Sequence, residues 1–127
     1  AAAGPPRYPV AQYGKAVGVP KDAMMRAVPH FALARILNAR GPALGGDPDQ
    51  GLRHFQRALQ VTDDKFLLAK SYIARDYCRM KQDKKLFRDT LVEVLETDPA
   101  IWPEQRLAGE IAHRRARRYL KMEKEWF

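Results

Sequence analysis

Five basic side chains crowd into the segment EIAHRRARRYLKM, residues 110–122. They are Arg114, Arg115, Arg117, Arg118 and Lys121. Guanidinium groups donate paired N–H bonds to phosphates and carboxylates, so the segment suggests a polyanion or an acidic partner. On a helical wheel all of them except Arg115 lie outside the apolar half or at its edge, which is also typical of a solvated helix face. Because no interleaved aromatic residues and no binding motif accompany them, nucleic-acid binding is the less favoured alternative.

Two cations lie on stripes that should be buried. Arg115 falls near the centre of the apolar half of its segment, and Lys70 lies between apolar residues of an earlier one. A cation there needs a carboxylate, carbonyl groups or a ligand, or a stem that reaches solvent. Two alternatives remain open: an ion pair with an acid such as Asp76 or Glu93, or a cavity that binds an anion.

No set of residues predicts catalysis. The histidines His30, His54 and His113 are far apart and lack metal-ligand spacing. The single cysteine, Cys78, has no histidine at a helical neighbour position and is interpreted as a core residue. We therefore expect no enzyme, no metal and no cofactor.

The chain has the size of one ordinary domain. Its 127 residues carry a formal net charge of +8, with a pI near 9.9. The excess positive charge lies before residue 41 and after residue 103, so one basic surface requires the two ends to meet. No apolar run is long enough to span a bilayer, and membrane association is expected only through a partner.

The apolar spacing predicts an all-α fold of five helices. We expect them at residues 22–40, 48–61, 65–80, 84–97 and 103–124. Asp47, Asp83, and either Asp63 or Asp64, are the predicted N-caps of the second, fourth and third helices. Pro29 is a predicted break in the first helix.

Side chains at helical spacing define the expected inner faces. Met24, Met25, Phe31, Ala34 and Leu37 are predicted to face inward from the first helix. On the last helix the apolar half begins at Leu107. Residues 1–21, rich in proline and glycine, form a separate extended arm, and Tyr8 and Tyr13 could attach it to a neighbouring surface.

One stretch follows a repeat pattern. Gly51, Phe55 and Ala58 match the small-x3-Phe-x2-Ala spacing of the second helix of a tetratricopeptide-type repeat. Asp98-Pro99 lies where such repeats place their closing proline. We therefore predict a degenerate tetratricopeptide-like solenoid of antiparallel helix pairs over residues 22–127.

Residues 28–127 resemble the TRAP transporter T-component family. The resemblance is carried by the turn Gly45-Gly46-Asp47, by Lys70 and Tyr77, by Asp83-x2-Leu86-Phe87, by Asp98-Pro99 and by the segment from Ile111 to Ala116. It implies an exported bacterial protein, periplasmic or otherwise outside the cytoplasm. It also implies a homotrimer that pairs with a substrate-binding protein and passes an apolar or carboxylate ligand.

These features together predict a non-enzymatic module that binds a protein partner in a transport-related assembly and forms homo-oligomers. Lys70, Tyr77 and Arg115 are the predicted cavity residues, and Tyr8, Tyr13, Arg114, Arg117 and Arg118 the predicted partner-binding residues. The alternatives are a structural scaffold that assembles through the arm and the solenoid surface, and a basic binder of nucleic acid or another polyanion.

Overall fold

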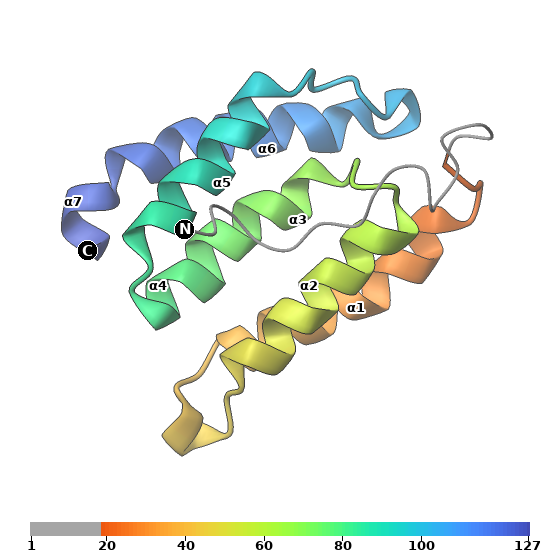
Figure 1. Ribbon diagram of the computed structural model, residues 1–127. Helices are drawn as coiled ribbons and strands as arrows, with labels where there is room; N and C mark the ends of the chain where they lie inside the picture. Colours follow the sequence, from red (N-terminus) through yellow and green to blue (C-terminus); the bar gives the residue numbers. More distant parts are fainter. Residues whose placement is uncertain (1–18) are drawn as a thin grey trace.

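The computed structural model describes residues 19–127, and that part of the chain is helical without a strand (Figure 1). The helices are α1 (Ala23–Asn38), α2 (Pro48–Val61), α3 (Leu67–Tyr72), α4 (Arg79–Lys81), α5 (Lys84–Glu96), α6 (Arg106–Lys121) and α7 (Glu123–Trp126). Two 3₁₀ turns, η2 (Pro42–Leu44) and η4 (Pro103–Gln105), and a π-helical segment, η3 (Ile73–Cys78), complete them. All five predicted helices are present. Most of the predicted arm, residues 1–18 with Tyr8 and Tyr13, lies outside the described residues.

The helix that joins α3, η3 and α4 lies in the middle of the fold. It contacts α1 and α2 on one side and α5 and α6 on the other (Figure 1). The pairs α1/α2 and α5/α6 each fold back on themselves through a short connection. Any site at this middle helix can therefore receive side chains from both pairs.

Two predicted aspartate caps are confirmed. Asp47 accepts a hydrogen bond from the backbone N–H of Gln50 at 3.1 Å, and α2 begins at the next residue, Pro48. Asp83 accepts one from the N–H of Leu86 at 3.0 Å at the start of α5. Each cap satisfies a backbone donor that a helix start would otherwise leave unpaired.

The predicted cap of the third helix is wrong. Asp63 and Asp64 both have positive φ angles, 55° and 62°, and form the turn before α3, which has Phe66 as its N-cap. Aspartate tolerates this left-handed conformation better than most residues. The Asp64 carboxylate pairs with Lys70 rather than with the start of α3.

The predicted break at Pro29 is also wrong. Helix α1 runs through Pro29 without interruption. Proline there removes one backbone hydrogen bond in the interior of the helix, and the packing of α1 on α2 supports the rest.

The core is one cluster of apolar side chains from all the longer helices. Phe55, Ile73, Phe87 and Leu91 are fully buried at its centre. Helices α1 and α2 approach closely at Gly51, where a Cβ atom would lie 2.2 Å from the Asn38 amide nitrogen. This close contact explains the small residue in the repeat-like pattern.

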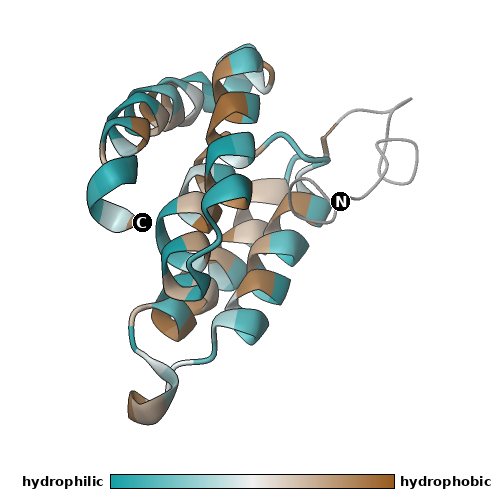
Figure 2. Cartoon of the chain, turned by 60° about the vertical axis from the view of Figure 1, so that its left-hand side comes forward, coloured by the Kyte–Doolittle hydropathy of each residue, from teal (hydrophilic) through white to brown (hydrophobic). Residues whose placement is uncertain are grey.

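Two predicted inner residues face outward. Met25 is 78% exposed and Leu107 is 72% exposed. Both lie close to the start of their helices. Figure 2 shows hydrophilic and hydrophobic stretches alternating along the helices, with hydrophobic residues at the tip of the turn around η2. Periodicity located the helices, but the neighbouring elements decided which side of each is covered.

Candidate functional site

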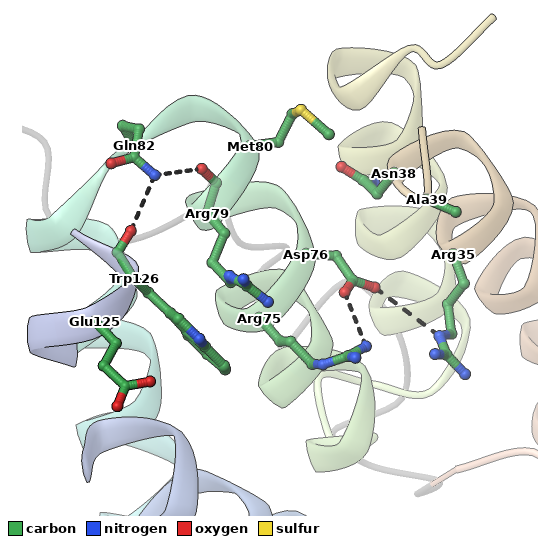
Figure 3. Close-up of a pocket in the computed structure, with 10 residues that line it drawn as sticks. All are labelled: Arg35, Asn38, Ala39, Arg75, Asp76, Arg79, Met80, Gln82, Glu125 and Trp126. Atoms are coloured by element: carbon green, nitrogen blue, oxygen red, sulfur yellow. Dashed lines mark hydrogen bonds and ion pairs between the residues drawn. The ribbon is translucent and has the colours of Figure 1, made fainter. Parts of the chain in front are cut away.

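A groove opens between α1, the η3–α4 part of the middle helix and α7. Its volume is about 770 Å³. Figure 3 shows its lining: Arg35, Asn38, Ala39, Arg75, Asp76, Arg79, Met80, Gln82, Glu125 and Trp126. We call this the arginine groove, because Arg35, Arg75 and Arg79 supply all of its positive charge.

One carboxylate bridges two of the three guanidinium groups. Asp76 Oδ1 lies 3.3 Å from Arg75 Nη1, and Asp76 Oδ2 lies 3.9 Å from Arg35 Nε (Figure 3). Arg79 has no carboxylate within 4 Å among residues 19–127, and its guanidinium stacks 4.0 Å above the Trp126 ring. The groove therefore has more cation than its own acids neutralise.

The Tyr72 ring lies close to two of the guanidinium groups. The Cζ atom of Arg35 lies 4.3 Å from the centre of the ring, and that of Arg75 lies 5.9 Å from it. A cation that is held by a ring rather than by a carboxylate keeps N–H donors available for another group. The site is thus suited to a planar acceptor such as a carboxylate.

Burial controls the one acid at the centre of the site. Burial raises the pKa of Asp76 above its ordinary value of 3.8, although Arg75, Arg35 and Arg79 each act to lower it. The loss of hydration therefore outweighs the neighbouring charges.

The π-helical segment positions part of the groove. Arg75 and Asp76 belong to η3, whose wider turn changes the direction of the residues that follow it. In this helix Arg79 follows four residues after Arg75 and reaches the same groove (Figure 3). Segments of this kind are common at functional sites.

Lys70 lies away from the groove in a saturated ion pair. Its Nζ atom is 2.8 Å from Asp64 Oδ2 and 2.9 Å from Glu93 Oε2, and the residue is 4% exposed. The expected ion-pair alternative thus describes it, with Asp64 as a second acid. Tyr77, also predicted for a cavity, is half-buried on the same helix, and burial and the Asp49 carboxylate raise its pKa.

Arg115 lies next to the arginine groove. Its Cζ atom is 5.5 Å from the Tyr72 ring, on which Arg35 and Arg75 also stack. It donates to the Tyr119 hydroxyl at 3.3 Å, which raises the arginine pKa, and its Nε atom is buried without a hydrogen-bond partner. Within residues 19–127 no interaction joins Lys70, Tyr77 and Arg115 to one another.

The remaining basic residues of the last helix are separated from one another. Arg114 and Arg117 line a second hollow of about 280 Å³ together with Pro99 and Leu107. Arg118 stacks on Tyr119 at 5.5 Å. The segment that looked like one basic patch therefore contributes to different surfaces.

The three groove arginines were not predicted as site residues from the sequence. The spacing of Arg75 and Arg79 by four residues was a usable signal, since it places both on one side of a helix. The residues around Arg35 in the sequence give no sign that α1 packs next to Arg75 and Arg79. Trp126 was not predicted as a site residue.

Two searches of the described residues found nothing. No cluster of three or more histidine, cysteine, aspartate or glutamate side chains that could hold a metal ion occurs within residues 19–127. Over the same range, no helix combines the length and apolar character needed to cross a bilayer.

Comparison with known proteins gives one match. The family model for the TRAP transporter T-component matches residues 25–127, which confirms the resemblance seen over residues 28–127. No curated protein and no solved structure matches this chain. The matched residues include every helix that lines the arginine groove, together with the middle helix. The chain belongs to the TRAP transporter T-component family, whose members are transporter-associated accessory proteins.

Proposed function

We propose that this chain is a non-enzymatic accessory module that works outside the cytoplasm by joining protein subunits of a TRAP-type transport assembly. The family match supports the transport context. The observation that carries the joining role is an uncovered apolar face on α1, and the first occupant that we assign to it is a second copy of this chain.

The apolar face runs along the outside of α1. Met25, Val28, Leu33 and Ile36 are 78%, 47%, 44% and 65% exposed. On a helical wheel they share one side with the exposed residues Pro29 and Ala32. We call these six residues the outer stripe.

An outer stripe of this kind is unusual at the end of a helical stack. Terminal helices of stacked helical proteins need a polar outer face to stay soluble, whereas α1 is apolar on its inner and its outer side. A contiguous exposed apolar surface indicates an interaction site. The outer stripe of one chain can pack against the same stripe of a second chain around a twofold axis. Self-association therefore requires no surface other than the outer stripe.

The test is native mass spectrometry and light scattering of the full chain. We expect an oligomer that becomes a monomer in Met25→Lys/Ile36→Lys, with an unchanged helical circular dichroism spectrum. The matched control is Val92→Lys/Leu107→Lys, which charges two exposed apolar residues on other helices and should leave the oligomer intact.

Other outcomes reject the assigned occupant. If the chain is a monomer and binds a substrate-binding protein through the outer stripe, it still joins subunits, but the occupant of the stripe is that protein and not a second copy. A monomer that binds no transport subunit would overturn the proposal. Oligomers that disappear only when residues 1–21 are deleted would favour the scaffold alternative.

Ligand binding is a second candidate function, and the position of Arg115 favours it. We propose that a carboxylate ligand would be held by Arg115 together with Arg35 and Arg75, since the Cζ atoms of all three lie within 5.9 Å of the centre of the Tyr72 ring. Tyr77 and Lys70 remain proposed ligand-binding residues. Lys70 would first have to break its ion pairs with Asp64 and Glu93. Native mass spectrometry of protein from its natural source should release a small acidic mass that Arg115→Ala abolishes.

A further inference from the structure

We propose that the arginine groove is the docking site for an acidic segment of a protein partner, whose aspartate or glutamate side chains reach the donors of Arg35, Arg75 and Arg79. This inference takes one thing from the accessory role proposed above, namely that the partner is a protein. It concerns a different surface from the outer stripe.

The charge of the groove favours an anion. Three guanidinium groups face two carboxylates, those of Asp76 and Glu125. Among the described residues 19–127, only the Asp76 carboxylate lies within 4 Å of a groove arginine, whereas the guanidinium of Arg79 lies over the Trp126 ring. An incoming acid would therefore meet, at Arg79, a guanidinium that has no carboxylate of its own to release.

Asp76 indicates which kind of anion fits. Its two oxygens already lie against Arg35 and Arg75, so the groove holds these arginines at a spacing that suits a carboxylate (Figure 3). A nucleic-acid strand would bring a row of phosphates past Asp76 and Glu125, which would repel it. Carboxylates spaced along a peptide can reach the arginines between these acids.

The shape and composition favour a segment over a small molecule. Arg35 and Arg79 are exposed, and the lining residues come from α1, the middle helix and α7 rather than from one enclosed cavity. Small-molecule sites are mostly apolar and enclose their ligand. Tryptophan, tyrosine and arginine instead dominate the energetic centres of protein interfaces, and here Trp126 and Tyr72 support the arginines.

The test is fluorescence anisotropy on the full chain with a labelled dodecapeptide of alternating glutamate and glycine. Arg35→Gln/Arg79→Gln should weaken binding about tenfold, because each change removes a charged donor. Arg114→Gln/Arg117→Gln removes the same charge beside the second hollow and should leave binding unchanged. A lysine–glycine peptide of the same length should not bind, and circular dichroism confirms that both variants fold.

Each other outcome overturns the inference. An equal loss in both double variants would mean that the net charge alone attracts the peptide. Displacement of the peptide by glutarate at equal concentration would assign the groove to a small carboxylate. Stronger binding of a short oligonucleotide with the same dependence on Arg35 and Arg79 would assign it to nucleic acid. If the peptide does not bind, the groove is not a docking site for an acidic segment. The proposed function would not be affected, because the oligomer test concerns the outer stripe.

Discussion

The middle helix contributes to two clusters of charged side chains, each of which contains both cations and carboxylates. The two clusters differ in how completely the carboxylates neutralise the cations. At the α3 end, Lys70 is buried between the carboxylates of Asp64 and Glu93. At the η3–α4 end, Arg75 and Arg79 share the open groove with Arg35 and a single close acid, Asp76. The first cluster has more acid than base, and the second has more base than acid.

The difference separates a structural role from a binding role. A buried ion pair that is fully satisfied is costly to break and offers nothing to a partner. A partly exposed cation held by an aromatic ring adds little stability but keeps its donors free. Lys70 was predicted as a binding residue because it lies on an apolar stripe. The unneutralised positive charge lies instead in the arginine groove.

Removal of Lys70 should give the largest effect on stability. Lys70→Met would leave Asp64 and Glu93 close together without their cation, and we expect a loss of about 3 kcal/mol in the free energy of unfolding. Urea denaturation measures it. Lys85→Met, which removes an exposed i,i+4 pair with Asp89, is the matched control and should cost at most about 0.5 kcal/mol. Equal losses in the two variants would contradict the contrast between the clusters.

Removal of two groove arginines should have a smaller effect on stability. Arg35→Gln/Arg79→Gln loses two ring contacts and one long ion pair, so we expect a change of about 0.5 to 1 kcal/mol in the same urea experiment. A loss as large as that of Lys70→Met would show that the groove is a structural cluster.

The Asp76 carboxyl should make stability depend on pH. Its pKa is raised above 3.8 in the folded state, so the folded protein holds this proton more tightly than the unfolded chain. Stability from this group is therefore lost as the pH rises from about 3.8 through the raised value. Denaturation across acidic pH should show a shallower fall in Asp76→Asn, and an unchanged slope would contradict the assignment to burial.

The His30–His54 pair should give the smallest effect, with the opposite sign. Their Nδ1 atoms are 2.9 Å apart across α1 and α2. Burial, with His54 and Arg57, lowers the pKa of His30 below 6.5. The unfolded chain then takes up the proton first, so stability is lost as the pH falls below about 6.5. His30→Gln should flatten that loss in thermal melts, whereas His113→Gln should leave it in place.

Local signals predicted the helices well. Asp47 and Asp83 were found as caps because each cap joins residues three apart in the chain. The helical periodicity likewise predicted the all-α class and the inward-facing residue Ala34, which is fully buried. The errors arose where tertiary contacts compete with local preference, as at Pro29 and at Asp64, whose carboxylate pairs with Lys70.

The sequence by itself determined which segments of the described chain are helical, and it placed Lys70 and Arg115 on apolar stripes. Only the tertiary structure decided that Glu93 reaches Lys70 across 23 residues, and that Arg35 and Trp126 meet Arg75 and Arg79. The reason is physical: caps and periodicity act within a few residues, whereas the neutralisation of a charge depends on which distant side chains the packing brings within about 4 Å.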